Sequence, residues 1–178
     1  MRKKNFISIL IIIVLVFDKN VQSQWNQDPY LNNSICTAPG FQYAPKITSD
    51  EKGGAYIIWE DFRDGTSKIY AQRIDKNGNV KWNINGIQIC SINSGQGNPQ
   101  IINDGNGGAI IIWVDDRNSN LDLYAQRVDS IGNKLWDSNG NIIFENNGNQ
   151  TQPQIVRATD NIFYVTCIDD RMGAPNIF

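Results

Sequence analysis

The sequence predicts an all-β protein built from β-propeller-like blades of four antiparallel strands each. Three observations lead to this fold class. Pro45, Pro99 and Pro153 recur every 54 residues, and 24 of 54 positions are identical between residues 45–98 and 99–152. Each copy contains short strand-like runs separated by turn residues, and no run has the 3.6-residue period of an amphipathic helix. A repeat of about 50 residues is the length of one kelch-type propeller blade.

The first half of each copy predicts two strands joined by a turn. In the first copy, the first strand starts at Pro45, because proline is tolerated where a strand needs no ladder donor. Residues 50–54 form the turn, and residues 55–59 are a continuous apolar run. Since such a run has no polar side, we expect this second strand to be covered on both faces.

The second half of each copy predicts two further strands. The third strand spans residues 69–74 and is followed by the Asn-Gly pair at 77–78, which favours a tight hairpin because both residues accept positive φ. Ile131 replaces the asparagine in the second copy, so a tight turn is less strongly predicted there. The fourth strand carries Trp82 and Ile89, with a bend or bulge between them.

The N-terminus and the repeats together divide the chain. Three basic residues at 2–4 precede an apolar run of 12 residues, shorter than the roughly 20 that span a bilayer, which is typical of a secretory signal peptide. We therefore expect a secreted or cell-surface protein without membrane insertion; an uncleaved N-terminal anchor is the alternative. The predicted segments are a signal peptide at 1–23, an N-terminal segment with a lone blade strand at 24–44, repeats at 45–98 and 99–152, and a truncated repeat at 153–178.

Charge and composition narrow the classes of function. Without the predicted signal peptide, 12 basic and 17 acidic residues remain, a net charge of −5, whereas nucleic acids and anionic lipids require clustered Lys and Arg. The absence of histidine removes the usual base of a catalytic triad and the commonest zinc ligand. We expect no enzymatic activity, no cofactor, no nucleic-acid partner, and a protein or glycan as ligand.

Two features that often indicate ligands have simpler interpretations here. The turns at 104–106 and 137–141 place oxygen-bearing side chains at alternate positions, but no following acid completes a calcium shell, so we expect no metal. Cys36 and Cys90 are equivalent positions, and Cys167 stands where the other copies have tryptophan. We therefore expect the cysteines to be buried apolar residues and not disulfides or metal ligands.

One charged pair recurs in every copy. The pairs are Asp61 with Arg63, Asp115 with Arg117, and Asp169 with Arg171. Because the residues are two apart on an extended strand, both side chains of a pair point to the same side. We predict a structural latch, in which the carboxylate accepts N–H groups of the turn and the guanidinium binds carbonyls of the next blade. The alternative is anion binding, in which the three arginines converge on a central pocket and hold a carboxylate or sulfate.

The motif Trp-x-Asp-x-Arg, followed by Ile-Tyr-Ala-Gln-Arg-Ile-Asp, Asn-Gly and Trp, resembles the repeats of large secreted β-propeller-like proteins of Bacteroidetes and related bacteria. Residues 59–63 with 69–75, and 113–117 with 123–129, carry the resemblance. It implies a multi-repeat secreted protein, and many such proteins end in a type IX secretion sorting domain. This chain lacks that domain and stops within a repeat, and the resemblance implies little about activity.

We therefore expect a secreted, non-enzymatic propeller segment that binds or scaffolds outside the cell. The alternative function is to supply the non-catalytic blades of a glycan-processing propeller enzyme of sialidase-like or glycosidase-like type. The sequence encodes about three blades, whereas closed rings have four to eight. Two explanations follow: the chain is a fragment of a larger protein, or copies of it associate to close the ring.

Overall fold

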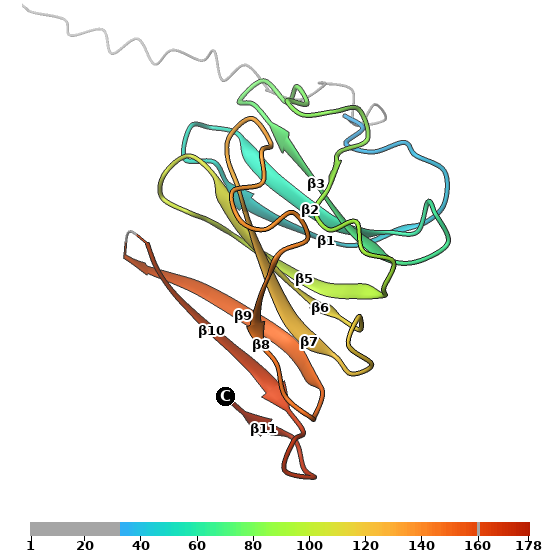
Figure 1. The fold of residues 1–178 in the computed structure, drawn as a ribbon. Coiled ribbons are helices and arrows are strands. Elements are labelled where there is room, and N and C mark those ends of the chain that lie inside the picture. The colour runs from blue at the N-terminus through green and yellow to red at the C-terminus, as the bar shows by residue number, and fades with distance from the viewer. Residues whose placement is uncertain (1–32, 160) are drawn as a thin grey trace, which may run out of the picture.

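The computed structural model describes residues 33–159 and 161–178, so the predicted signal peptide at 1–23 lies outside the described residues. Within the described part, eleven strands form three antiparallel sheets and no helix is present, which confirms the all-β class (Figure 1). It follows that no described helix is available to cross a membrane. The strands are β1 (Gln42–Ser49), β2 (Ala55–Asp61), β3 (Lys68–Ile74), β4 (Ile87–Gln88), β5 (Gln96–Asn103), β6 (Ala109–Asp115), β7 (Asp122–Val128), β8 (Asn141–Phe144), β9 (Gln150–Thr159), β10 (Ile162–Asp169) and β11 (Asn176–Ile177).

Each sheet is a simple meander in which strands adjacent in sequence pair with each other. The first sheet has the order β1-β2-β3-β4, the second β5-β6-β7-β8, and the third β11-β10-β9. Antiparallel four-stranded meanders repeated along the chain are the blades of a β-propeller-like fold. One sheet thus forms from each copy of the 54-residue repeat.

The second sheet lies between the first and the third (Figure 1). The first strands of the three sheets, β1, β5 and β9, contact one another in succession, whereas the outer strands β4 and β8 make no comparable contact. The sheets therefore fan out from their first strands, as blades do around an axis.

Two apolar cores fill the spaces between the sheets. Tyr56 and Ile58 of β2 share the first core with Ile111 of β6, and Ile112 of β6 packs towards Val165 of β10 in the second. Because β6 supplies alternate residues to both cores, all of its residues are buried, as expected for a continuous apolar run. The equivalent strands β2 and β10 have a neighbouring sheet on one face only and are less buried.

The prediction that the first strand starts at the proline is wrong by three residues. β1 begins at Gln42, and the equivalent strands β5 and β9 also begin at a glutamine, three residues before their prolines. The residue before each proline has positive φ, 49° at Ala44, 51° at Asn98 and 50° at Gln152. The pairing register shifts at this point, so a β-bulge accommodates the proline and the ladder continues on its N-terminal side.

Aspartate side chains fix the turns. The Asp75 carboxylate accepts the N–H groups of Asn77 (2.9 Å) and Asn79 (3.0 Å) in the hairpin after β3. The second copy forms the same turn around Asp129, although Ile131 replaces the asparagine. The substitution is tolerated because the positive φ falls on the following glycine, Gly132, at 93°.

The fourth strand is shorter than predicted. β4 contains only Ile87 and Gln88, and Trp82 lies in the loop before it. The side chain of Gln72 holds this loop, since its amide donates to the carbonyl of Asn83 (2.9 Å) and its oxygen accepts the N–H of Trp82 (2.9 Å). A side chain thus satisfies backbone groups that a longer strand would pair.

The predicted lone strand of the N-terminal segment is absent from its described part, since residues 33–41 contain no strand and residues 24–32 lie outside the described residues. All three cysteines are free thiols; Cys90 and Cys167 are buried and Cys36 is half-buried.

Candidate functional site

The three Asp–Arg pairs occupy equivalent places on the three sheets. Each aspartate is the last residue of the second strand of its sheet, and each arginine lies two residues further in the following loop. The aspartate side chains are fully buried, and the arginine side chains are 17%, 12% and 27% exposed in chain order. A buried carboxylate needs compensating donors, and its own arginine is the first of them.

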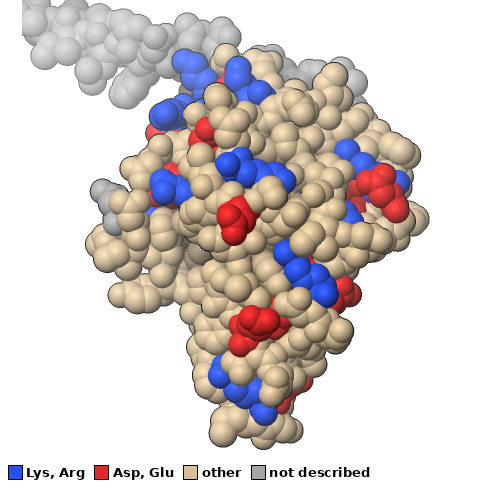
Figure 2. All heavy atoms as spheres, in the orientation of Figure 1, with Lys and Arg blue, Asp and Glu red and all other residues tan. Residues whose placement is uncertain are grey.

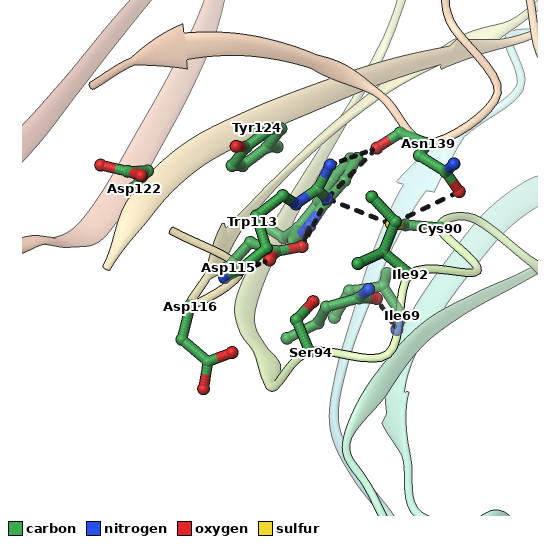
Figure 3. A network of polar contacts seen from close by, with 12 residues as sticks. Ile69, Cys90, Ile92, Ser94, Trp113, Asp115, Asp116, Asp122, Tyr124 and Asn139 are labelled. Carbon is green, nitrogen blue, oxygen red and sulfur yellow. Dashed lines mark hydrogen bonds and ion pairs between the residues drawn. The ribbon is translucent and has the colours of Figure 1, made fainter. Parts of the chain in front are cut away.

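Figure 3 shows Asp115, the aspartate of the pair on the second sheet, with its carboxylate beside the indole of Trp113. One carboxylate oxygen accepts Nη2 of Arg117 (2.5 Å) and Nε1 of Trp113 (3.1 Å), and the other accepts the backbone N–H of Arg117 (3.0 Å). The guanidinium carbon of Arg117 lies 3.7 Å from the centroid of the Tyr124 ring, a cation–π contact.

The pair of the first sheet repeats this arrangement. Asp61 accepts Nη2 (2.6 Å), Nε (2.8 Å) and the backbone N–H (2.9 Å) of Arg63, and also Nε1 of Trp59 (2.8 Å). The guanidinium of Arg63 lies 3.9 Å from the centroid of the Tyr70 ring. The planar guanidinium therefore binds in a two-pronged manner that a lysine would not reproduce.

The third pair keeps the bonds between the aspartate and its arginine, but the residues around the pair differ. Asp169 accepts Nε of Arg171 (2.8 Å) and its backbone N–H (2.8 Å). Cys167 replaces the tryptophan, and the side-chain amide of Gln150 donates to the carboxylate instead (3.3 Å). Phe178 takes the place of the tyrosine under the guanidinium, at 4.2 Å.

The carbonyls that the arginines bind differ from the prediction. Arg63 donates to the carbonyl of Asn85 (2.9 Å), and Arg117 to that of Asn139 (3.3 Å). Both asparagines belong to the same repeat as their arginine, so the expected bond to the next blade is not the one that forms. The loop before the outermost strand, and not the neighbouring sheet, lies against the guanidinium.

The contact to another repeat runs backwards along the chain, through sulfur. Nη2 of Arg117 lies 3.1 Å from Sγ of Cys90, which follows the fourth strand of the preceding sheet. Nη2 of Arg63 approaches Sγ of Cys36 in the same way, at 3.5 Å. The first two pairs thus hold the segments that lead into their own sheets.

The contacts of Arg63 and Arg117 show on which side of their sheets these two guanidinium groups lie. Arg63 and Arg117 lie beside the loops that lead to β4 and β8, the outermost strands. The sheets meet at their first strands, on the opposite side of each sheet. Their guanidinium groups therefore lie away from the line along which a shared central pocket would form.

The electrostatics keep the three carboxylates ionised. Burial by itself raises the pKa of Asp61, Asp115 and Asp169, but the hydrogen bonds that each carboxylate accepts and the charge of the paired arginine together outweigh this effect, so the pKa of each carboxyl is lowered. The Trp59 and Trp113 indoles add to the lowering at the first two carboxyls. Such groups act as charged hydrogen-bond acceptors at neutral pH.

Sequence reasoning missed the partners that complete each pair, although the same period marks them. Asn85 and Asn139 are 54 residues apart, as are Tyr70 and Tyr124. Asn139 also accepts the N–H of Ser91 (3.0 Å) through its side chain. A search for every position identical in both copies would have found these residues, but not their roles.

A polar groove lies beside the second sheet. It has a volume of about 600 Å³ and is lined by Asn118, Ser119, Asn120, Glu145, Asn146 and Asn147. The side-chain amides of Asn118 and Asn120 both donate to the buried Asp122 carboxylate, at 3.1 and 3.0 Å, which fixes their orientation. Sequence reasoning missed this groove because five of its six lining residues depart from the repeat.

The charges on the surface are mixed. Figure 2 shows acidic and basic side chains interspersed on the visible face, without a large region of one sign. Within residues 33–159 and 161–178, no cluster of three or more His, Cys, Asp or Glu side chains is arranged to hold a metal ion. In the turn at Asp104, the carboxylate accepts the N–H groups of Asn106 (2.8 Å) and Gly108 (2.7 Å), and Nε of Arg127 (2.7 Å).

Comparison with known proteins gives a likeness of fold. No family model matches the sequence, and no curated protein matches it. Among solved structures, the endo-arabinase from Bacteroides thetaiotaomicron VPI-5482 is similar, with a TM-score of 0.52 and 11% sequence identity. The match covers 84% of this chain and 59% of that chain, so this chain spans well under two thirds of the enzyme. The chain is thus similar in fold to a glycoside hydrolase, at a sequence identity that indicates fold alone.

Proposed function

We propose that this protein is a secreted, non-enzymatic β-propeller-like segment that binds or scaffolds outside the cell, and that its Asp–Arg pairs are structural latches. The observation that carries the proposal is that Asp61 and Asp115 are fully buried and that each accepts Nη2 and the backbone N–H of its arginine and the indole N–H of a tryptophan. A group that makes the same internal contacts in successive units has a structural role common to all of them. Ligand binding is then a task for residues that differ between units.

The protonation of the carboxyls supports a non-enzymatic role for the latches. A glycosidase needs one carboxyl with a raised pKa as general acid, beside a second that stays ionised. The pKa of Asp61, Asp115 and Asp169 is lowered in each case, because donors surround each carboxylate. These residues are suited to holding an arginine and poorly suited to delivering a proton.

The polar groove of the second sheet is our candidate ligand site. Asn118, Asn120 and Glu145 line it, and the corresponding residues of the first copy are Asp64, Thr66 and Ser91. Amide and carboxylate side chains offer the donors and acceptors that a hydroxyl-rich ligand requires, and Asp122 orients two of the amides before any ligand arrives. We propose a glycan as the ligand class.

A glycan array followed by calorimetric titration tests this function. We expect the chain to bind at least one glycan class, and Glu145→Ala to weaken that binding while the free energy of unfolding stays the same. The matched control is Asp64→Ala, an exposed position on the first sheet equivalent to Asn118 of the groove. Equal loss of binding in both variants, or no binding by the unaltered chain, would contradict the proposed site.

A second candidate function rests on the likeness to the endo-arabinase. In this alternative, the chain supplies non-catalytic blades of a glycan-processing propeller enzyme. Because non-catalytic blades do not cleave the substrate, this candidate predicts that the chain binds arabinan without releasing reducing sugar, whereas binding of other glycans but not of arabinan supports the first candidate.

Secretion remains part of the proposal and rests on the sequence. The predicted signal peptide ends at residue 23, so the exported protein should begin at Gln24. Mass spectrometry of protein recovered from the medium measures this start, and an intact N-terminus at Met1 would contradict export by cleavage.

A further inference from the structure

Within the described residues, the first and third sheets each have a neighbouring sheet on one face only (Figure 1). On the third sheet, Tyr164 of β10 is 64% exposed and Ile177 of β11 is 81% exposed. On the first sheet, Ile47 of β1 is 67% exposed. Contiguous exposed apolar faces on a soluble protein mark interaction sites.

The exposed residues of the third sheet have buried counterparts in the preceding repeats. Tyr56 and Ile110 occupy the position of Tyr164 and are 1% and 3% exposed. Leu123 occupies the position of Ile177 and is fully buried. The open face of the third sheet therefore carries counterparts of the residues by which the first sheet packs on the second and the second sheet packs on the third.

A hydrogen bond between the first and second sheets indicates what such a face binds. The hydroxyl of Tyr56 donates to the carbonyl of Gly107, in the turn before β6, at 2.7 Å. Tyr164 is the same residue type at the same position of the repeat, and Gly53 is the counterpart of Gly107 on the first sheet. A first sheet packed against the third would offer Tyr164 the same acceptor.

The two open faces also carry apolar side chains at matching places. Between the first and second sheets, Glu60 of β2 accepts the N–H of Asn98 at 2.8 Å, beside Gly97. Val114 and Ile168 are the counterparts of Glu60 on the second and third sheets, and Tyr43 is the counterpart of Gly97 on the first. The open face of the third sheet thus has an apolar side chain where the first sheet has a carboxylate, and the open face of the first sheet has an aromatic ring at the position of Gly97.

We propose that a second copy of this chain docks the open face of its first sheet onto the open face of the third sheet. Tyr43 and Ile47 of one copy meet Tyr164, Ile168 and Ile177 of the other. The occupant is a copy of the same chain because this contact continues the packing that already joins the sheets. Two such contacts join the three described sheets of one copy to the three of the other, and the resulting ring of six sheets is within the four to eight blades of closed propellers.

Sedimentation velocity of the full chain over a range of concentrations tests this proposal. We expect a dimer. Tyr164→Arg and Ile47→Arg each place a charge in the contact from one side, and each should weaken association by at least about 100-fold. Ile84→Arg is the control, because Ile84 is 84% exposed in the loop before β4 and lies on neither open face. Circular dichroism confirms that each variant is folded.

Mixing the two disrupted variants is the sharper measurement. Each variant keeps one intact face, so an equimolar mixture should restore one contact and give a heterodimer. If the contact instead joined two identical faces, one of the variants would still dimerise alone, and mixing the two would not increase the amount of dimer. That result would overturn the proposal. A monomeric unaltered chain at all concentrations also overturns it.

Discussion

Asp61→Ala is the substitution that examines the latch most closely. The carboxylate is fully buried, and it accepts the indole N–H of Trp59, the backbone N–H of Arg63 and two guanidinium nitrogens of the same arginine. Alanine removes all of these acceptors together. The guanidinium then keeps the carbonyl of Asn85, the sulfur of Cys36 and the ring of Tyr70.

The size of the effect follows from burial. Removing one partner of a buried ion pair costs about 3–5 kcal/mol, because the remaining charge is left uncompensated. The Arg63 side chain is 17% exposed and retains one carbonyl, so water and this bond offset part of the cost. We therefore expect the free energy of unfolding to fall by about 3 kcal/mol.

Urea unfolding followed by tryptophan fluorescence measures this change. Asp64→Ala is the matched control in the same loop, because Asp64 is exposed, and it should change stability by less than about 0.5 kcal/mol. Asp61→Asn keeps one oxygen acceptor and should lie between the two. If Asp61→Ala is as stable as the unaltered protein but no longer binds its glycan, the latch reasoning is refuted and the pair is a ligand site.

Three further results are expected. Gly86→Ala should be more destabilising than Gly65→Ala, because both residues have positive φ but only a Cβ at Gly86 would meet another group, the Trp59 ring at 2.6 Å. Equal decreases in the free energy of unfolding, measured in urea, would contradict this packing. In acid, the latch carboxyls have a lower pKa in the folded protein than the value near 4 of the unfolded chain, so their contribution to stability is complete above about pH 4 and is lost as the pH falls towards the folded pKa. The free energy of unfolding of Asp61→Asn should therefore fall less steeply with pH in this range, and a pH dependence equal to that of the unaltered protein would count against the ion pair. In alkali, burial raises the pKa of Tyr56 from its ordinary 10 to about 12, so the stability linked to its neutral hydroxyl is complete below about pH 10 and is lost as the pH approaches 12. Tyr56→Phe should remove this pH-dependent part of the stability, and an alkaline unfolding profile identical to that of the unaltered protein would contradict the prediction.

The middle strands of each sheet were predictable because two independent signals agree there. The apolar run at 55–59 and the repeated run at 69–74 place β2 and β3 close to their observed bounds, Ala55–Asp61 and Lys68–Ile74. The period of 54 then assigns the same strands to the second copy. Local propensity and burial on both faces favour the same structure, so little tertiary information is needed.

The first and fourth strands were less predictable because side chains and backbone strain decide their limits. Positive φ at Ala44 is not a conformation that alanine favours, so the bulge before Pro45 carries little signal in the sequence. Gln72 holds the loop around Trp82 by two hydrogen bonds, and a glutamine in a strand does not by itself predict such a contact. A strained backbone at the first strand and a side-chain contact at the fourth thus override the local pattern.

The Asp–Arg pairs were predictable as a pair and not as a complete site. Two residues of opposite charge two apart on a strand end predict the ion pair from the side-chain period alone. The carbonyl that Arg63 binds depends on how the loop at Asn85 returns across the strand end, which strand periodicity does not encode. The polar groove at Glu145 lies where the copies diverge, so the repeat gives no guide to it.

The most direct test of the structural role of these pairs is nitrogen-15 NMR of the arginine side chains. Nε of Arg63 and Nε of Arg171 each lie 2.8 Å from their aspartate carboxylate. We predict that these Nε–H protons exchange slowly with solvent in the ligand-free protein and that their signals do not move when acetate or sulfate is added. Rapid exchange, together with signals that shift as either anion is titrated, would contradict the latch and show that the arginines are available to bind anions.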